Sequence, residues 1–160
     1  MRARLGAAFL LIASSAALGG LQPQQSTPFG PLHTGPGKRV GDIRFEPKGS
    51  GFSYGLVGDH CEIVKDKFYC LFSFEQHLGT VKEWPAKDAW VENYALDQFG
   101  EKHYKISAFY LSARGAEQPT ATLAPGDKVH LVQVFESADK AITHLTIVSP
   151  YGELRDLTVE

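Results

Sequence analysis

Two cysteines are the residues whose spacing most clearly predicts chemistry. Cys61 and Cys70 enclose a segment that predicts a β-hairpin if Lys65 and Asp66 form a two-residue turn. Counting outward from that turn places the cysteines opposite one another as a non-hydrogen-bonded pair, with Cα atoms about 4.5 Å apart. We therefore expect a disulfide between them. The alternative is a redox-active pair, but the segment lacks Cys-x-x-Cys spacing and a neighbouring helix start that would lower a thiol pKa.

Six histidines are the other candidates for chemistry, and no two of them have metal-ligand spacing. Alternate residues of a strand share a face, so two groups could combine a histidine with carboxylates. These groups are Asp59, His60 and Glu62, and Glu75 with His77. We expect both to be solvated edges, and we predict no metal and no cofactor. His130 and His144 could approach one another if their strands pair, and would then form a pH-sensitive spot.

The motifs of the common enzyme classes are missing from the sequence. There is no Gly-x-Ser-x-Gly elbow, no phosphate loop, no Gly-x-Gly-x-x-Gly and no His-Glu-x-x-His. The Gly-rich and Ser-rich residues 49–55 have the composition of a turn and a strand. We therefore predict that the protein is not an enzyme. A hydrolase or metal-dependent enzyme of another kind stays open, and would need polar residues that converge in a pocket.

Composition indicates one globular domain. Of the 160 residues 43% are hydrophobic and 21% are charged, which is neither disordered nor coiled-coil composition. A formal net charge of -2 provides no cluster of cations to neutralise phosphates, so we predict no nucleic-acid partner. Two cysteines are too few for a disulfide scaffold or a four-thiolate zinc site.

The first 20 residues predict an export signal. Arg2 and Arg4 precede the apolar residues 5–13, and small residues follow, which is the order found in secretory signal peptides. A membrane anchor is the alternative, but the apolar run is about half of the roughly 20 residues that a bilayer span needs. We expect a secreted, periplasmic or cell-envelope location, with no membrane span after the signal is removed.

The rest of the chain predicts a linker and then an all-β domain. Residues 21–38 are rich in Pro and Gly and have no hydrophobic period, so they predict a flexible linker. In residues 39–160, short apolar or alternating runs separated by turn residues predict an all-β sandwich or barrel, and we expect an antiparallel β-sandwich. The expected strands are residues 41–47, 51–57, 61–64, 68–77, 90–96, 105–111, 121–123, 128–135, 144–148 and 154–159, with a possible helical turn at 85–88. The expected core is Phe45, Phe52, Phe68, Phe72, Phe74, Trp90, Tyr94, Phe109, Leu131, Phe135, Leu145, Ile147 and Leu157.

Three stretches, residues 68–79, 90–104 and 123–136, resemble a bacterial family of extracytoplasmic immunoglobulin-like domains of unknown function. That family is similar to the secreted immunogenic antigens of mycobacteria, and the resemblance covers residues 40–160. It implies an immunoglobulin-like antiparallel sandwich, export, and contact with a protein or the cell envelope, without catalysis. This chain differs from the family in its two cysteines, in a longer stretch at residues 79–88 and in His77, where Asn is usual.

Turn residues within these stretches have physical roles. Asp97 and Gly100 predict a reversal between two strands, and Pro125 with Gly126 predicts the turn before the strand at 128–135, because Pro presets φ and Gly accepts a positive φ.

The expected function is a non-catalytic module that binds an unidentified extracytoplasmic protein or envelope component. Trp84 and Pro85, within residues 79–88, are the candidate contact residues because a rigid aromatic in a long connection suits an interface anchor. The alternative for Trp84 is that it packs under the sandwich as part of the core. The alternative function is an inhibitor or chaperone-like module acting on a secreted hydrolase.

Overall fold

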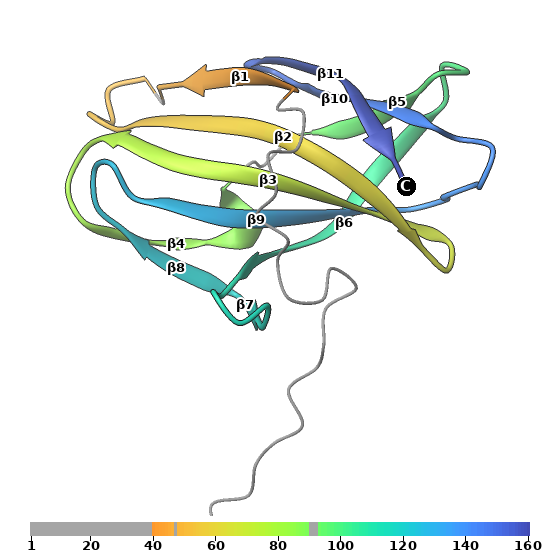
Figure 1. Cartoon of the computed structure of the whole chain (residues 1–160). Coiled ribbons are helices and arrows are strands. Elements are labelled where there is room, and N and C mark those ends of the chain that lie inside the picture. Colours follow the sequence, from red (N-terminus) through yellow and green to blue (C-terminus); the bar gives the residue numbers. More distant parts are fainter. Residues whose placement is uncertain (1–39, 47, 90–92) are drawn as a thin grey trace, which may run out of the picture.

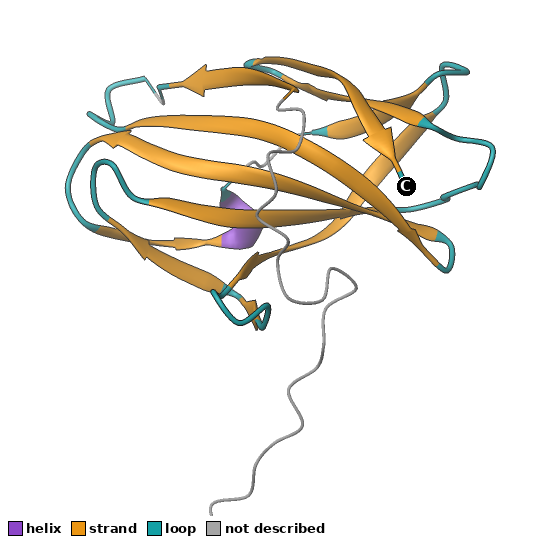
Figure 2. Ribbon diagram, in the orientation of Figure 1, coloured by secondary structure: helices purple, strands orange, loops and turns teal. Residues whose placement is uncertain are grey.

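The computed structural model describes residues 40–46, 48–89 and 93–160 (Figure 1). In chain order the elements are β1 (Val40–Phe45), β2 (Ser53–Val64), β3 (Lys67–Leu78), β4 (Lys82–Pro85), η1 (Ala86–Asp88), β5 (Tyr94–Asp97), β6 (Lys102–Leu111), β7 (Glu117–Gln118), β8 (Thr120–Leu123), β9 (Lys128–Phe135), β10 (His144–Ser149) and β11 (Gly152–Val159). The predicted signal at 1–20, the linker at 21–38 and Trp90 lie outside the described residues. Figure 2 shows one helical turn among the strands, and the helical turn expected at 85–88 is confirmed as η1.

The strand pairings close on themselves. The order is β2, β11, β10, β5, β6, β9 and β3, and β3 pairs again with β2, so seven strands form a barrel-like ring. β1 is added to β2, β7 is added to β6, and β4 pairs with β8 as a separate two-stranded sheet. The predicted all-β class is confirmed. The finer prediction, an immunoglobulin-like sandwich, is not confirmed by this connectivity, which links the ring strands into one sheet.

Alternation along the strands creates two apolar clusters. In β3, Phe68, Cys70, Phe72 and Phe74 are buried inside the ring, as their spacing of two requires. The core that they join also contains Ile43, Tyr54, Leu56, Cys61, Ala86, Ala89, Ala95, Tyr110, Leu123, Leu131, Phe135, Ile142, Leu145, Ile147, Leu154 and Leu157. A second cluster consists of Leu71, Phe109, Leu111, Val132 and Val134.

Most of the expected core residues that the structure describes are buried. Phe109 is also buried, but in the second cluster and not in the ring interior. Phe52 and Tyr94 are half-buried. The side chains of Phe45 and Trp90 lie outside the described residues.

Two predicted connections are wrong. The strands expected at 51–57 and 61–64 are one strand without a turn between them, because β2 continues through Gly58 and Asp59 with a register shift opposite β3. A Cβ on Gly58 would lie 3.2 Å from Leu157, so this glycine permits close packing between strands. The expected connection at residues 79–88 contains β4, whose Lys82–Pro85 pairs with β8.

Candidate functional site

The hairpin around the cysteines has the predicted register. Its pairs are Val64 with Lys67, Ile63 with Phe68, Glu62 with Tyr69, and Cys61 with Cys70. The two cysteines form a disulfide with a Cα–Cα distance of 4.0 Å. Both cysteines are fully buried within the main core, so the bridge is a structural disulfide that joins β2 to β3.

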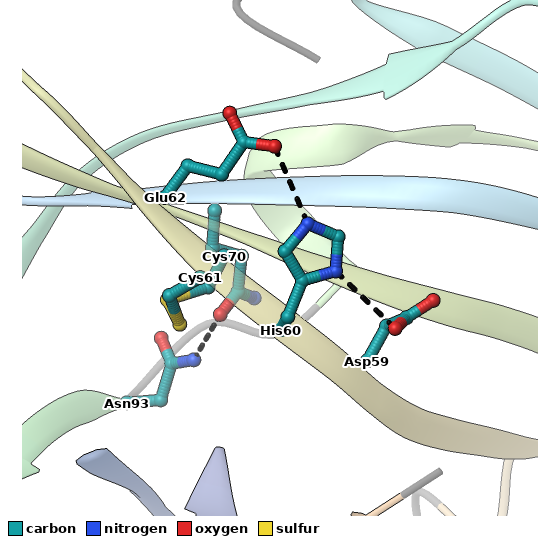
Figure 3. The surroundings of a disulfide bond; sticks show 7 residues. Asp59, His60, Cys61, Glu62, Cys70 and Asn93 are labelled. Carbon is teal, nitrogen blue, oxygen red and sulfur yellow. Dashed lines mark hydrogen bonds and ion pairs between the residues drawn. A yellow bond between two sulfur atoms is a disulfide. The ribbon is translucent and has the colours of Figure 1, made fainter. Parts of the chain in front are cut away.

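His60 lies beside this bridge, between two carboxylates (Figure 3). Its Nδ1 is 3.2 Å from Asp59 and its Nε2 is 3.4 Å from Glu62. Burial lowers the pKa of His60, but the hydrogen bonds to Asp59 and Glu62 outweigh burial and leave the pKa above its usual value. The carboxylates contact opposite sides of the ring, so the three groups do not converge on one point as metal ligands would.

The second predicted group has a different partner. Glu75 lies 3.5 Å from His77 Nδ1 and 3.0 Å from Lys128 Nζ, so a lysine already neutralises the carboxylate. In the described part of the chain, no three His, Cys, Asp or Glu side chains are arranged to hold a metal ion. The predicted approach of His130 to His144 is wrong, because β5 and β6 separate their strands in the ring.

A buried ion pair joins β5 to β6. His103 Nε2 lies 3.1 Å from Asp97 Oδ2, and both side chains are almost fully buried. The other ring nitrogen lies 3.1 Å from the carbonyl oxygen of Glu136. Both ring nitrogens therefore lie within hydrogen-bonding distance of oxygen atoms of the protein itself. This pair therefore links β5, β6 and the residue that follows β9.

Trp84 is packed against the core at the end of the ring where β3 leads into β4. Its ring packs edge-on against Tyr54 and Phe52, with ring centroids 4.8 Å and 5.7 Å away. Its Nε1 donates a hydrogen bond to Gln76 Oε1 at 3.3 Å. The side chains of Trp84 and Pro85 are half-buried. Much of the Trp84 surface is therefore already in contact with the protein, and its role as a partner anchor stays a prediction.

A hollow of about 510 Å³ lies elsewhere, over β5, β6 and the end of β10. The described residues that line it are Asn93, Tyr94, Tyr104, Lys105, Val148, Ser149 and Pro150. Tyr94 is the register partner of both Val148 and Tyr104, so these three residues form a row across three strands. This site was not among the sequence predictions, which placed Tyr94 in the core, although strand alternation on either side of the Asp97 and Gly100 turn was a signal that Tyr94 and Tyr104 face outward.

Polar groups stand beside the tyrosine row. Lys105 is half-buried, and burial lowers the pKa of its amine to about 8 while Asp88 acts in the opposite direction. Asn93 is 8% exposed and donates to the fully buried Gln133. Among the described residues, Asn93 Oδ1 and Gln133 Nε2 have no hydrogen-bond partner. The hollow thus combines aromatic side chains with a half-buried lysine, while the unsatisfied Asn93 oxygen lies in the interior.

Comparison with known proteins shows no family for this chain. Neither a protein-family model nor a curated protein matches the sequence. No helix in the described ranges is long and apolar enough to cross a membrane. Among solved structures, the secreted protein MPT63 of Mycobacterium tuberculosis is similar with a TM-score of 0.48 and 10% identity, covering 74% of this chain and 92% of that one. A similarity at this level of identity and TM-score does not place the chain in a family.

Proposed function

We propose that this chain is an extracytoplasmic, non-catalytic binding module that holds a cell-envelope component or a protein at the hollow lined by Tyr94 and Tyr104. The observation that carries the proposal is the row of outward aromatic side chains around a concave surface. Tyr104 is 59% exposed, and Tyr151 beside Pro150 is 54% exposed. Partly exposed tyrosines of this kind supply large contact areas at little entropic cost.

The chemistry of the buried groups supports binding without catalysis. The two ring nitrogens of His103 face a carboxylate and a carbonyl, and those of His60 face two carboxylates. A general base needs a free acceptor within reach of a substrate proton. Neither histidine supplies one in this arrangement.

Two observations support an oxidising, extracytoplasmic location. The segment at residues 1–20 has the order of a signal peptide, and Cys61 is bridged to Cys70. As the finer form of the fold, we propose kinship with the immunoglobulin-like extracytoplasmic domains that the sequence resembles.

A retention experiment with purified variants tests the proposed function. The chain from residue 21 onward, with its disulfide intact, is immobilised and exposed to secreted and envelope fractions of the source organism. We expect one dominant species to be retained, and we expect Tyr104→Ala to reduce its retention by about tenfold or more. Phe99→Ala is the matched control, because Phe99 is 69% exposed and does not line the hollow.

Two other outcomes would redirect the proposal. Retention that survives Tyr104→Ala but is lost in Trp84→Ala would move the binding surface to β4. That result would favour the inhibitor or chaperone-like alternative, since β4 and β8 form a sheet separate from the ring. If every variant retained the species equally, the hollow would have no part in binding.

A further inference from the structure

We propose that the hollow is occupied by a proline-rich segment of this chain itself, residues 28–31, which lies across the tyrosine row as one turn of polyproline II helix. This inference rests on the proposed function, because it concerns the same hollow and names what a partner must displace from it. Four features carry it: the width of the row, the charge of the hollow, the spacing of the prolines and the length of chain that joins them to β1.

The tyrosine row has the width of one polyproline turn. Tyr94 is paired with Tyr104 on β6 and with Val148 on β10, so the three side chains share one face of three neighbouring strands. Neighbouring strands lie about 4.8 Å apart, so the row measures about 9.6 Å from end to end. A polyproline II helix has three residues per turn and rises about 3.1 Å per residue, so prolines three positions apart share a face at about 9.3 Å. Two such prolines can therefore contact the two ends of the row.

Aromatic faces give this row its affinity for proline. Lys102 Nζ lies over the Tyr94 ring, 4.5 Å from its centroid, and this contact positions the ring. Tyr104 beside it is 59% exposed. Grooves lined by aromatic side chains bind proline-rich segments, because proline rings pack against aromatic faces and the extended segment is already ordered before it binds.

The charge of the hollow favours a neutral occupant. Lys105 is the only charged side chain among the described lining residues, and Asp88 already acts on its amine. The hydroxyl of Ser149 is engaged within its own turn. Residues 21–37 contain no Asp, Glu, Lys or Arg, so this segment brings no charge to a surface that does not need one.

One pair of prolines has the matching spacing. Of the nine prolines in the chain, only Pro28 and Pro31 are three positions apart. A proline ring fixes φ at about −65°, close to the polyproline II value, and the residue before a proline is restricted to extended backbone. The sequence of this segment therefore favours the conformation that fits the row.

The segment is long enough to reach the hollow from β1. A Cβ on Gly152 would lie 3.6 Å from Ile43 of β1, and Gly152 follows two positions after Pro150 at the rim of the hollow. Val40 is three residues before Ile43, so it lies within roughly 25 Å of Pro150 at about 3.3 Å per residue. The nine positions from Val40 back to Pro31 span about 28 Å in polyproline II conformation.

Two double variants of the chain from residue 21 onward test the docking. Pro28→Ala/Pro31→Ala removes both rings of the matching pair. Pro23→Ala/Pro36→Ala is the control, because it removes two prolines of the same linker that are not three positions apart. All four positions precede β1, so neither variant alters a strand of the ring.

NMR spectra of these proteins report on the hollow. We expect nuclear Overhauser contacts from Pro31 to Val148 and from Pro28 to Tyr104 in the unsubstituted chain, because Pro31 is nearer to β1. The amide signals of Tyr94, Tyr104 and Val148 should move in Pro28→Ala/Pro31→Ala and stay in place in the control. Identical signals at these amides in all three proteins would overturn the inference.

Dilution separates docking within one molecule from exchange between copies. A tethered segment has an effective concentration in the millimolar range, so the contacts should survive a tenfold dilution of the protein. Loss of the contacts on dilution would overturn the assignment to the same molecule.

The failure of this inference can be told apart from failure of the proposed function. Because segment and partner compete for one surface, we expect Pro28→Ala/Pro31→Ala to bind the retained species about tenfold more tightly than the control variant. If Tyr104→Ala abolishes retention while the linker variants leave the signals of the hollow unchanged, the proposed function stands and this inference fails. If the proline contacts are present but retention does not depend on Tyr104, the segment docks and the proposed function fails.

Discussion

His103 Nε2 lies 3.1 Å from the carboxylate of Asp97 in the interior of the protein, and the other ring nitrogen lies 3.1 Å from the carbonyl oxygen of Glu136. Asp97 also accepts the backbone N–H groups of Phe99 at 2.8 Å and Glu101 at 2.9 Å. One carboxylate therefore holds the β5–β6 turn and also contacts the buried His103 ring. The pair fixes the hairpin that carries Tyr94 and Tyr104.

Removal of the Asp97 carboxylate should be strongly destabilising. Asp97→Ala leaves the buried His103 ring and two turn N–H groups without their carboxylate partner, so we expect a loss of about 3 to 5 kcal/mol in unfolding free energy. Urea denaturation measures it. Asp127→Ala is the control, because Asp127 is exposed and accepts one backbone N–H from Ala124, and its loss should cost about 1 kcal/mol. Equal losses in the two variants would contradict the ion pair.

Acid should weaken the fold through the same carboxylate. Burial raises the pKa of Asp97, but the Glu101 N–H, the His103 ring and the Phe99 N–H outweigh burial and hold the pKa below its usual 3.8. A carboxyl group with a lowered folded pKa contributes stability above pH 3.8, and that stability is lost as pH falls through the folded value. The urea concentration at the unfolding midpoint of the wild type should therefore fall as the pH is lowered through this range. An Asp97→Asn protein with the same acid slope would refute the assignment.

His60 should make stability depend on pH in the opposite sense. Its pKa is raised by Asp59 and Glu62 despite burial, so its contribution is fully present below 6.5 and is lost as pH rises through the folded value. We expect the melting temperature of the wild type to fall over this interval relative to His60→Gln, which cannot titrate. Parallel pH profiles for the two proteins would show that the carboxylates do not stabilise charged His60.

The disulfide should contribute about 2 to 3 kcal/mol, because it closes a short loop with a sequence separation of 9. Chemical denaturation of the wild type with and without reductant measures this, and the double variant Cys61→Ala/Cys70→Ala gives a second estimate that includes packing loss. Since both sulfurs are buried, reduction should be slow in the native protein and fast in urea. Rapid reduction without denaturant would contradict the buried position.

A glycine at position 65 should stabilise the turn between β2 and β3. Lys65 has a φ of 59°, a conformation that costs a non-glycine residue about 1 kcal/mol. Lys65→Gly should therefore raise the unfolding free energy by about 0.5 to 1 kcal/mol in urea denaturation. Lys140→Gly is the control, since Lys140 is not among the residues with positive φ, and it should lower stability. A loss in both variants would argue against strain at Lys65.

Local geometry accounts for what the sequence predicted well. The register from Val64 and Lys67 to Cys61 and Cys70 follows from a two-residue turn alone, and each pair appears as expected. The reversal at Gly100 likewise depends on nearby residues, with its N–H donating to the carbonyl of Asp97. Both features involve segments that are adjacent in the chain, where alternation and turn chemistry are sufficient.

Long-range pairing accounts for what the sequence did not predict. The hollow needs Val148 beside Tyr94, and no local signal brings a residue 54 positions later in the chain to that strand. The separation of His130 from His144 depends on the same strand order. Trp84 was ambiguous for a related reason, since its packing against Phe52 and Tyr54 requires β4 to fold back on the end of the ring.

The ring is completed by a short parallel seam between β11 and β2. Only Thr158 with His60 and Val159 with Cys61 are paired there, together with backbone hydrogen bonds from Glu160 to Cys61 and from Ile63 to Glu160. A strand edge released at this seam would fit the vacated edge of another copy as well as its own. We therefore expect domain swapping of β11 as a route of misassembly when this seam is weakened. Weakening the seam should produce concentration-dependent, strand-exchanged oligomers that light scattering can detect.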